Sequence, residues 1–245
     1  MNKSFISLDE YLQKIGNIFF RWRSYIPLLL IPILFLKTKN LQIIFNNHYI
    51  EMAYQLICVI ISITGEFMRI ITIGYVPSGT SGRNTKEQRA TTLNTSGTYS
   101  IMRNPLYFGN YLIILGISLF WRSWELVIFN SLLFAFFYVP IILVEERFLL
   151  NRFNDDYRKY VNNTPCFFPR FSLWNPANTK WSWKMVIRRE YNSIFALSLS
   201  FALVAHLRLY LINNKMVFGI SWVIFVGVFM ALWLVIRFLK LAKRL

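Results

Sequence analysis

Long apolar runs, separated by shorter polar segments, make up most of this chain. The runs cover approximately residues 19–36, 52–76, 106–120, 126–144, 194–212 and 217–239. A helix needs about 20 mostly apolar residues to cross a bilayer, so the first and third runs are short for a span. The pattern predicts an all-α fold, a polytopic membrane protein with about six transmembrane helices. No linker rich in Pro, Gly or Ser divides the chain, and we interpret 1–245 as a single membrane domain.

The ends of the runs carry further information. Only residues 121–125 separate the third and fourth runs, which predicts a tight antiparallel helical hairpin. Arg21, Trp22 and Arg23 at the start of the first run are typical of an interfacial anchor. The stretch before that run is acidic and polar, and it does not have the composition of a cleavable signal peptide.

Positive charge is distributed unevenly between the two ends of the predicted helices. The chain has 27 lysines and arginines against 11 acidic residues, and its formal net charge is +16. One set of helix ends is flanked by few basic residues, namely Lys37, Lys39, Arg122 and Lys215. The positive-inside rule therefore predicts that both termini and the segments 77–105 and 145–191 face the cytoplasm, most simply from a bacterial inner membrane. Because the charge lies beside apolar runs, it favours lipid head groups over nucleic acid as the partner.

Two polar segments interrupt the apolar pattern. Residues 77–98 are rich in Gly, Ser, Thr and Asn. The second segment, 145–190, opens with EERFLLNRFNDDYRKYV, in which apolar side chains recur at helical spacing. That spacing predicts an amphipathic helix with one face on the membrane. The tryptophans of 174–183 are interpreted as an interfacial aromatic belt.

Motifs whose side chains could bind a ligand or take part in catalysis lie on both sides of the predicted hairpin. Before it stand Gly97-x-Tyr99 and the run RNPLYFG at 103–109. After it stand Glu145-Glu146, Leu149, Phe153-Asn154, Tyr157 and Tyr160. In this order the two sets resemble the isoprenylcysteine carboxyl methyltransferase family, which is similar to the phospholipid methyltransferases. The resemblance covers about 50–171, a methyltransferase-like core, and leaves a C-terminal helical pair at 192–240. It implies an integral membrane methyltransferase that uses S-adenosylmethionine in a cytoplasmic cofactor-binding region.

Each residue of the first motif also has a physical interpretation of its own. Pro105 can open a helix whose exposed N–H groups suit a carboxylate, such as the one that S-adenosylmethionine carries. Gly109 permits close approach of a backbone or a ligand. Tyr99 and Tyr107 can stack on adenine or lie near the sulfonium. A simple helix start and interfacial anchoring explain the same residues without a ligand.

Two adjacent glutamates, Glu145 and Glu146, fall where an apolar run meets the cytoplasm. Ionisable groups at such a boundary are costly unless they are paired or functional. One interpretation is that a carboxylate here binds the amino group or the ribose hydroxyls of the cofactor. The other is a salt bridge to Arg103 or Arg147.

The resemblance implies roles for individual residues. Cofactor contacts are expected at Asn84, Thr91, Thr92, Leu93, Asn94, Tyr99, Asn104, Pro105, Leu106, Tyr107 and Glu145. Arg103 and Glu146 are the expected catalytic residues. Two positions depart from the family pattern, because Asn104 stands where the family usually has His, and Ile141 stands where the isoprenylcysteine enzymes have an acceptor-binding Arg. The second departure argues against a prenylcysteine carboxylate as the acceptor.

The expected acceptor is a membrane-embedded lipid or lipidated molecule with an anionic head group, either a phosphate or a carboxylate. An anionic oxygen needs no general base to accept a methyl group. Arg21 or Arg23 can hold a phosphate with a guanidinium fork, or can serve only as positive-inside anchors. Arg69 is instead interpreted as the ion-pair partner of Glu66, three residues before it. Open alternatives are a phospholipid amine N-methyltransferase with Glu146 as proton acceptor, a nicotinamide-dependent sterol-type reductase, and a non-catalytic membrane protein.

Other classes of site find no support in the sequence. A soluble Rossmann-type methyltransferase is excluded, because no G-x-G-x-x-G follows a strand pattern. Cys58 and Cys166 have neither disulfide nor metal spacing, and no metal-ligand spacing surrounds His48 or His206. We therefore expect no metal cofactor, and the sequence predicts no particular oligomeric state.

Overall fold

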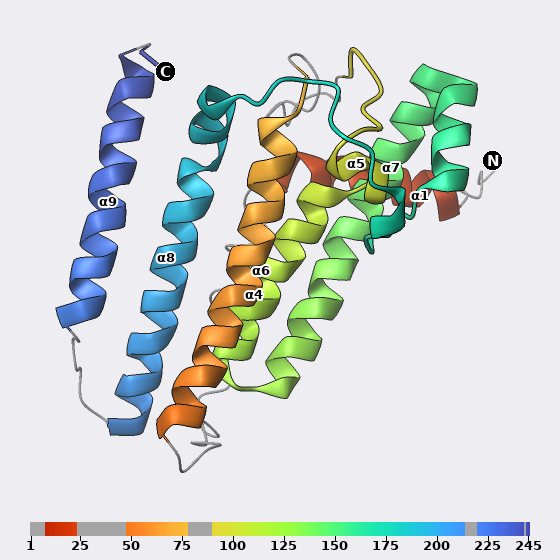
Figure 1. Ribbon diagram of the computed structural model, residues 1–245. Helices are drawn as coiled ribbons and strands as arrows, with labels where there is room; N and C mark the ends of the chain where they lie inside the picture. Colours follow the sequence, from red (N-terminus) through yellow and green to blue (C-terminus); the bar gives the residue numbers. More distant parts are fainter. Residues whose placement is uncertain (1–7, 24–47, 78–89, 214–219, 243) are drawn as a thin grey trace, which may run out of the picture.

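A computed structural model of the chain describes residues 8–23, 48–77, 90–213, 220–242 and 244–245. Within these residues the regular elements are helices. The five long apolar ones stand side by side (Figure 1), and their bounds are α4 (His48–Gly74), α6 (Pro105–Trp121), α7 (Trp124–Asn163), α8 (Trp183–Asn213) and α9 (Ile220–Leu241). The short elements α1 (Leu8–Trp22), α5 (Thr98–Ile101) and η1 (Phe171–Leu173) lie near one end of this bundle (Figure 1).

The long helices match the predicted apolar runs. Four of them in the described part of the chain, α4, α7, α8 and α9, are long and apolar enough to cross a membrane, and α6 is a shorter apolar helix. The all-α, polytopic membrane fold is therefore confirmed. The first predicted run, 19–36, falls mostly outside the described residues. Its first residues, up to Trp22, end α1, which crosses the bundle instead of standing parallel to it (Figure 1).

Helices α4 and α6 approach each other closely through glycines. A Cβ atom added to Gly65 would lie 2.5 Å from the carbonyl oxygen of Gly109, and one added to Gly109 would lie 2.7 Å from that of Gly65. Small residues at such crossings let two helix backbones touch, which is a main source of packing energy between helices in a membrane. Gly109 was predicted to permit close approach of either a backbone or a ligand, and the structure shows the approach of a backbone.

The turn between α6 and α7 confirms the predicted hairpin. Arg122 ends α6 in the left-handed conformation, with φ 68°, and its N–H donates to the carbonyl of Leu119. The Ser123 side chain then accepts a hydrogen bond from the N–H of Leu126 at 3.3 Å. This cap satisfies one of the free N–H groups at the start of α7.

Helix α7 does not end at the membrane surface. The predicted amphipathic segment 145–161 continues the apolar run as one helix, which bends at Asn154, where φ is 43° and ψ is −113°. Beyond the bend Tyr157 is buried, and the Tyr160 hydroxyl donates to the carbonyl of Tyr99 at 2.6 Å. The bend therefore folds the last part of α7 back onto the residues before α6.

Asn154 occupies a backbone conformation that costs a residue with a Cβ about 1–3 kcal/mol. We therefore expect Asn154→Gly to raise the free energy of unfolding by about 1 kcal/mol. The same substitution at Asn151, which is exposed and helical, should lower it by a few tenths of a kcal/mol, because glycine favours the unfolded chain. Thermal unfolding in detergent would compare the two variants, and a lower stability for both would refute the bend.

The segment after α7 crosses over the end of the bundle to reach α8 (Figure 1). Its Trp181 ring covers Gly74, where an added Cβ would lie 2.2 Å from the indole, and it packs edge-on against Tyr75 at 5.0 Å. Trp174 and Trp183 are exposed. The aromatic-belt interpretation is therefore wrong for Trp181, which packs within the protein.

Candidate functional site

Helix α1 brings an arginine to the site. Gly16 lets α1 contact α7, since a Cβ there would lie 2.5 Å from the carbonyl oxygen of Pro140. At the end of α1, the Arg23 guanidinium stacks over the buried Phe20 ring at 4.1 Å. Its Nη1 donates to Glu145 Oε1 at 2.9 Å and to the Tyr107 hydroxyl at 3.3 Å. One arginine thus joins α1, α6 and α7 at a single point.

Two tyrosines complete this group. Tyr107 is 9% exposed and its ring packs against Tyr138 at 5.1 Å. Burial, and next the charge of Glu145, raise the pKa of Tyr99 well above its ordinary value, while Arg189 and Arg23 lower it by less. The Tyr99 phenol therefore keeps its proton at neutral pH and lies within electrostatic range of all three charged groups.

Four residues predicted for the site are therefore neighbours: Arg23, Tyr99, Tyr107 and Glu145. Arg189, in the first turns of α8, lies within electrostatic range of Tyr99 but was missed in the sequence. It falls in the basic segment 145–191, where it is one of many positive charges and no motif distinguishes it. Glu145 forms its ion pair with Arg23. The salt bridge to Arg103 that the sequence suggested for the two glutamates is present at Glu146.

The second glutamate pairs separately. Arg103 donates from Nε to Glu146 Oε1 at 2.8 Å and from Nη2 to Glu146 Oε2 at 3.2 Å. Its Nη1 donates to the carbonyls of Val161 and Thr164, at 3.1 and 2.9 Å. Paired forks of this kind are among the stronger hydrogen-bonded contacts in proteins. Arg103 therefore fixes the start of α6 to both halves of the bent α7.

The N-terminus of α6 lies between these two groups. Pro105 is its first residue, and the side chain of Asn104 makes no capping hydrogen bond. The Asn104 amide instead donates to the carbonyl of Cys166 at 3.0 Å and approaches Glu146 Oε1 at 3.5 Å. Because the cap side chain points elsewhere, the N–H groups of Leu106 and Tyr107 receive no acceptor from it, which suits an anionic ligand.

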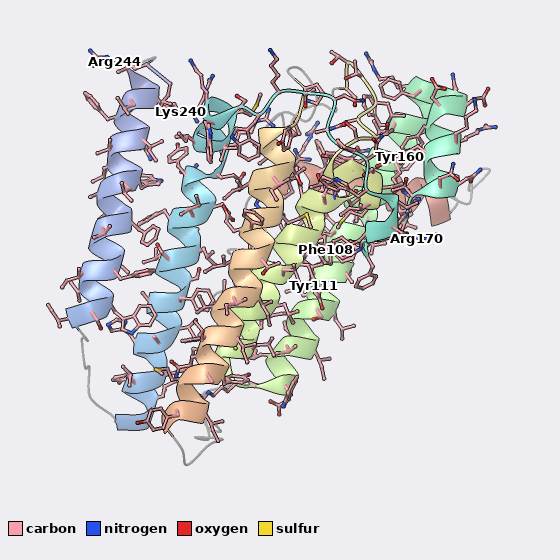
Figure 2. The ribbon with its side chains drawn as sticks, in the orientation of Figure 1. Phe108, Tyr111, Tyr160, Arg170, Lys240 and Arg244 are labelled. Atoms are coloured by element: carbon pink, nitrogen blue, oxygen red, sulfur yellow. The ribbon has the colours of Figure 1, made fainter. Side chains whose placement is uncertain are left out.

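An aromatic cluster holds the chain after α7 against α6. Phe167 packs edge-on against Phe108 at 5.5 Å and against Tyr111 at 6.0 Å. Figure 2 shows Phe108, Tyr111 and Tyr160 on the same side of the bundle. Beside them Cys166 keeps its proton, because burial and then Glu146 raise the pKa of the thiol.

The remaining predicted contacts lie at the edge of this region. Thr91 and Thr92 are exposed, and Leu93 and Asn94 are partly exposed. They precede Gly97, which adopts φ 62° and whose N–H donates to the Asn175 carbonyl at 2.8 Å. Arg21 is exposed at the end of α1, and Asn84 lies outside the described residues.

A cavity of about 300 Å³ opens inside the bend of α7. Its lining consists of Glu146, Arg147, Leu150, Tyr157, Arg158, Val161 and Asn162. The volume is at the lower end of what small-ligand sites offer, about 300–1,000 Å³. The cavity therefore adjoins the Arg103–Glu146 pair without being large enough on its own for an extended cofactor.

Comparison with known proteins identifies the central part of the chain. Residues 50–156 match the family model described as phospholipid methyltransferase. This match to the phospholipid methyltransferase family covers somewhat less than half of the chain. The family segment contains Tyr99, Tyr107, Glu145 and Glu146, and it confirms the resemblance seen in the sequence. A membrane methyltransferase, in the broad sense of that family, is thereby supported.

Two curated relatives share this segment. The chain is 42% identical over 88 residues to the cobalt-zinc-cadmium resistance protein CzcN of Cupriavidus metallidurans, covering 36% of this chain and 40% of the relative. It is 37% identical over 92 residues to the nickel-cobalt-cadmium resistance protein NccN of Alcaligenes xylosoxydans xylosoxydans, covering 38% and 43%. The chain thus spans about two fifths of the length of these relatives. No solved structure matches.

Proposed function

We propose that the chain is an integral membrane methyltransferase that uses S-adenosylmethionine and acts on a lipid or lipidated acceptor in the bilayer. The observation that carries this proposal is the convergence of Tyr99, Tyr107 and Glu145 beside the uncapped N-terminus of α6. All of these residues lie in the phospholipid methyltransferase segment. The carboxylate of Glu145 is complementary to an amine, and the two aromatic rings are complementary to an adenine and a sulfonium. The uncapped helix N-terminus is complementary to a carboxylate.

The cofactor supplies an already activated methyl group, so the protein needs to align the reactants and exclude water. Glu145 can accept hydrogen bonds from an amino group or from ribose hydroxyls, and Arg23 fixes its orientation. The Tyr107 ring is held by Tyr138 on one side and by the Arg23 contact to its hydroxyl. Arg103 and Glu146 act as a clamp that positions the start of α6.

The charges near the site favour an anionic acceptor. Both oxygens of Glu146 accept from Arg103, so this carboxylate is poorly placed to take a proton from an amine. Around Tyr99, by contrast, the charges of Arg23 and Arg189 oppose the single charge of Glu145. We propose that Arg23 and Arg189 hold a lipid phosphate or carboxylate, whose oxygen is its own nucleophile. Because Arg21 is exposed at the end of α1, we propose that it contacts the head group only from the solvent side.

Lipid analysis tests the acceptor. Mass spectrometry of lipid extracts from cells with and without the protein should show a lipid that has gained a methyl group on a phosphate or carboxylate. Methylated ethanolamine head groups would identify an amine N-methyltransferase instead. A lipid that has gained two hydrogens would indicate a reductase, and unchanged lipids would contradict a lipid acceptor.

We also propose that both termini face the cytoplasm from a bacterial inner membrane. Figure 2 shows Lys240 and Arg244 at the same end of the bundle as Tyr160, and the basic segments near the site lie at that end. The positive-inside rule assigns this end to the cytoplasm. Fusions of a reporter active only in the cytoplasm should therefore be active at either terminus, and activity of a periplasmic reporter at the C-terminus would refute the orientation.

A further inference from the structure

A second cluster of charged residues lies at the end of the bundle opposite Glu145. Glu51 stands in the first turn of α4, Arg122 follows α6, and Arg208 lies near the end of α8. Arg122 Nη2 forms an ion pair with Glu51 Oε1, and Arg208 Nη2 lies 3.6 Å from the same oxygen. One carboxylate therefore faces two guanidinium groups, and the cluster carries an excess positive charge.

These arginines are buried but incompletely satisfied. Arg122 is 8% exposed and Arg208 7%. Arg208 Nη1 donates to the Phe120 carbonyl at 3.2 Å. Among the described residues, however, Nε and Nη1 of Arg122 and Nε of Arg208 are buried without a hydrogen-bond acceptor. Charged N–H groups that lack an acceptor are rare inside proteins, because their burial costs much free energy.

Among the described residues the surroundings offer one further acceptor, because Glu51 Oε2 is also buried without a hydrogen-bond partner, and this single oxygen cannot satisfy all of the unpaired N–H groups. The Arg122 guanidinium faces the Tyr54 ring at 5.4 Å, and the Arg208 guanidinium faces Phe120 at 5.7 Å. Glu51 also accepts from Gln55 Nε2 at 2.6 Å, so its charge is shared among three donors. Burial, and next the charge of Arg208, lower the pKa of Arg122 to about 10. An added anion would supply acceptors to these N–H groups and would offset the positive charge of the two arginines.

We propose that Arg122 and Arg208 form a binding site for a phosphate group, distinct from the methyltransferase site. The guanidinium group is planar and presents parallel N–H donors that match two phosphate oxygens. The Glu51 side chain, which is 18% exposed, marks the side from which the cluster is reached. Exposed apolar residues beside it, including Tyr49, Ile50 and Trp124, place it at the depth of lipid head groups. The phosphate is therefore that of a phospholipid in the leaflet opposite the proposed catalytic site.

Thermal unfolding of the delipidated protein in neutral detergent tests this site with two probes, phosphatidylglycerol and inorganic phosphate. Phosphatidylglycerol should raise the unfolding midpoint of the wild type, since a ligand that binds the folded state stabilises it. In Arg122→Gln/Arg208→Gln the apparent affinity should fall by about tenfold or more, a loss that corresponds to about 1.4 kcal/mol or more. The matched control Arg152→Gln/Lys159→Gln, on the exposed part of α7, should keep the wild-type affinity.

A third variant separates a ligand site from a structural ion pair. Glu51→Gln removes the competing carboxylate and should increase the affinity for the phosphate probe by about tenfold. If the cluster were only an ion pair, this variant would lower the midpoint without changing the response to either probe. An equal response to inorganic phosphate would identify a soluble anion as the ligand of the same site. The proposal is overturned if neither probe stabilises the wild type more than Arg122→Gln/Arg208→Gln.

Discussion

The substitution Glu190→Gln is expected to lower the free energy of unfolding by about 3–5 kcal/mol, because it leaves a buried arginine without its main partner. Glu190 is 1% exposed, and it accepts from Arg69 Nε at 2.9 Å and from Nη2 at 2.7 and 2.9 Å. Arg69 also donates to the Asn110 side chain, and Glu66 lies 3.8 Å away. The expected pair with Glu66 is therefore present, but Glu190 is the closer partner.

Thermal unfolding in detergent would measure this loss. The double variant Arg69→Met/Glu190→Met is its control, because replacing both members of a buried pair by apolar residues is often neutral or stabilising. It should recover most of the stability that Glu190→Gln loses. Equal stability of Glu190→Gln and the wild type would show that the pair does not hold α8 to α4.

This pair also links the C-terminal helices to the family segment. Arg69 lies in the matched segment 50–156, whereas Glu190 lies beyond it in α8. On the other side of Arg69, Asn110 donates to the Tyr138 hydroxyl at 3.4 Å, and Tyr138 packs against Tyr107. A chain of polar and aromatic contacts thus runs from α8 to the proposed cofactor site.

The substitution Glu145→Gln is expected to weaken binding of S-adenosylhomocysteine by about tenfold or more. A hydrogen bond to a charged group contributes about 1.5–3 kcal/mol, and a factor of ten in affinity corresponds to about 1.4 kcal/mol. Calorimetric titration of the purified protein would measure the change. Glutamine has nearly the same size as glutamate, so a loss of affinity would measure the contribution of the negative charge of Glu145.

Two controls distinguish a cofactor contact from a structural role of Glu145. Asp155→Asn, an exposed change of the same kind on the same helix, should leave the affinity unchanged. Arg23→Gln removes the ion-pair partner and should weaken cofactor binding less than Glu145→Gln, since Arg23 acts on the cofactor through the carboxylate and not by direct contact. If Glu145→Gln lowers stability but not affinity, the carboxylate serves only its ion pair with Arg23.

The apolar pattern was sufficient to predict the long helices and the hairpin, because these depend on local hydrophobicity and turn length. The bend at Asn154 had only a weak sign in the sequence, since Asn adopts positive φ more readily than most residues that carry a Cβ. The course of α7 after the bend depends on contacts with Tyr99 and Arg103, which are distant in sequence. Such contacts cannot be derived from periodicity.

The same limit applies to the site. Motifs identified Tyr99, Tyr107 and Glu145, and the structure brings these three together. The pairing of Glu145 with Arg23 depends on α1 lying across α7, which no local pattern specifies. Arg189 was missed for a related reason, because α8 begins at Trp183 and thus includes charged residues that the polarity of 145–191 had assigned to a loop. Whether these residues bind the cofactor stays a prediction.

The most direct measurement follows a labelled methyl group. Purified protein would be incubated with a lipid extract and S-adenosylmethionine that carries the label on its methyl carbon, and the lipid phase would then be analysed. We expect the wild type to transfer the label to a lipid, and Glu145→Gln to lose most of this activity at a cofactor concentration that saturates only the wild type. Asp155→Asn should retain it. A wild-type protein that binds neither S-adenosylmethionine nor S-adenosylhomocysteine, and transfers no label to any lipid of its native membrane, would contradict the methyltransferase assignment.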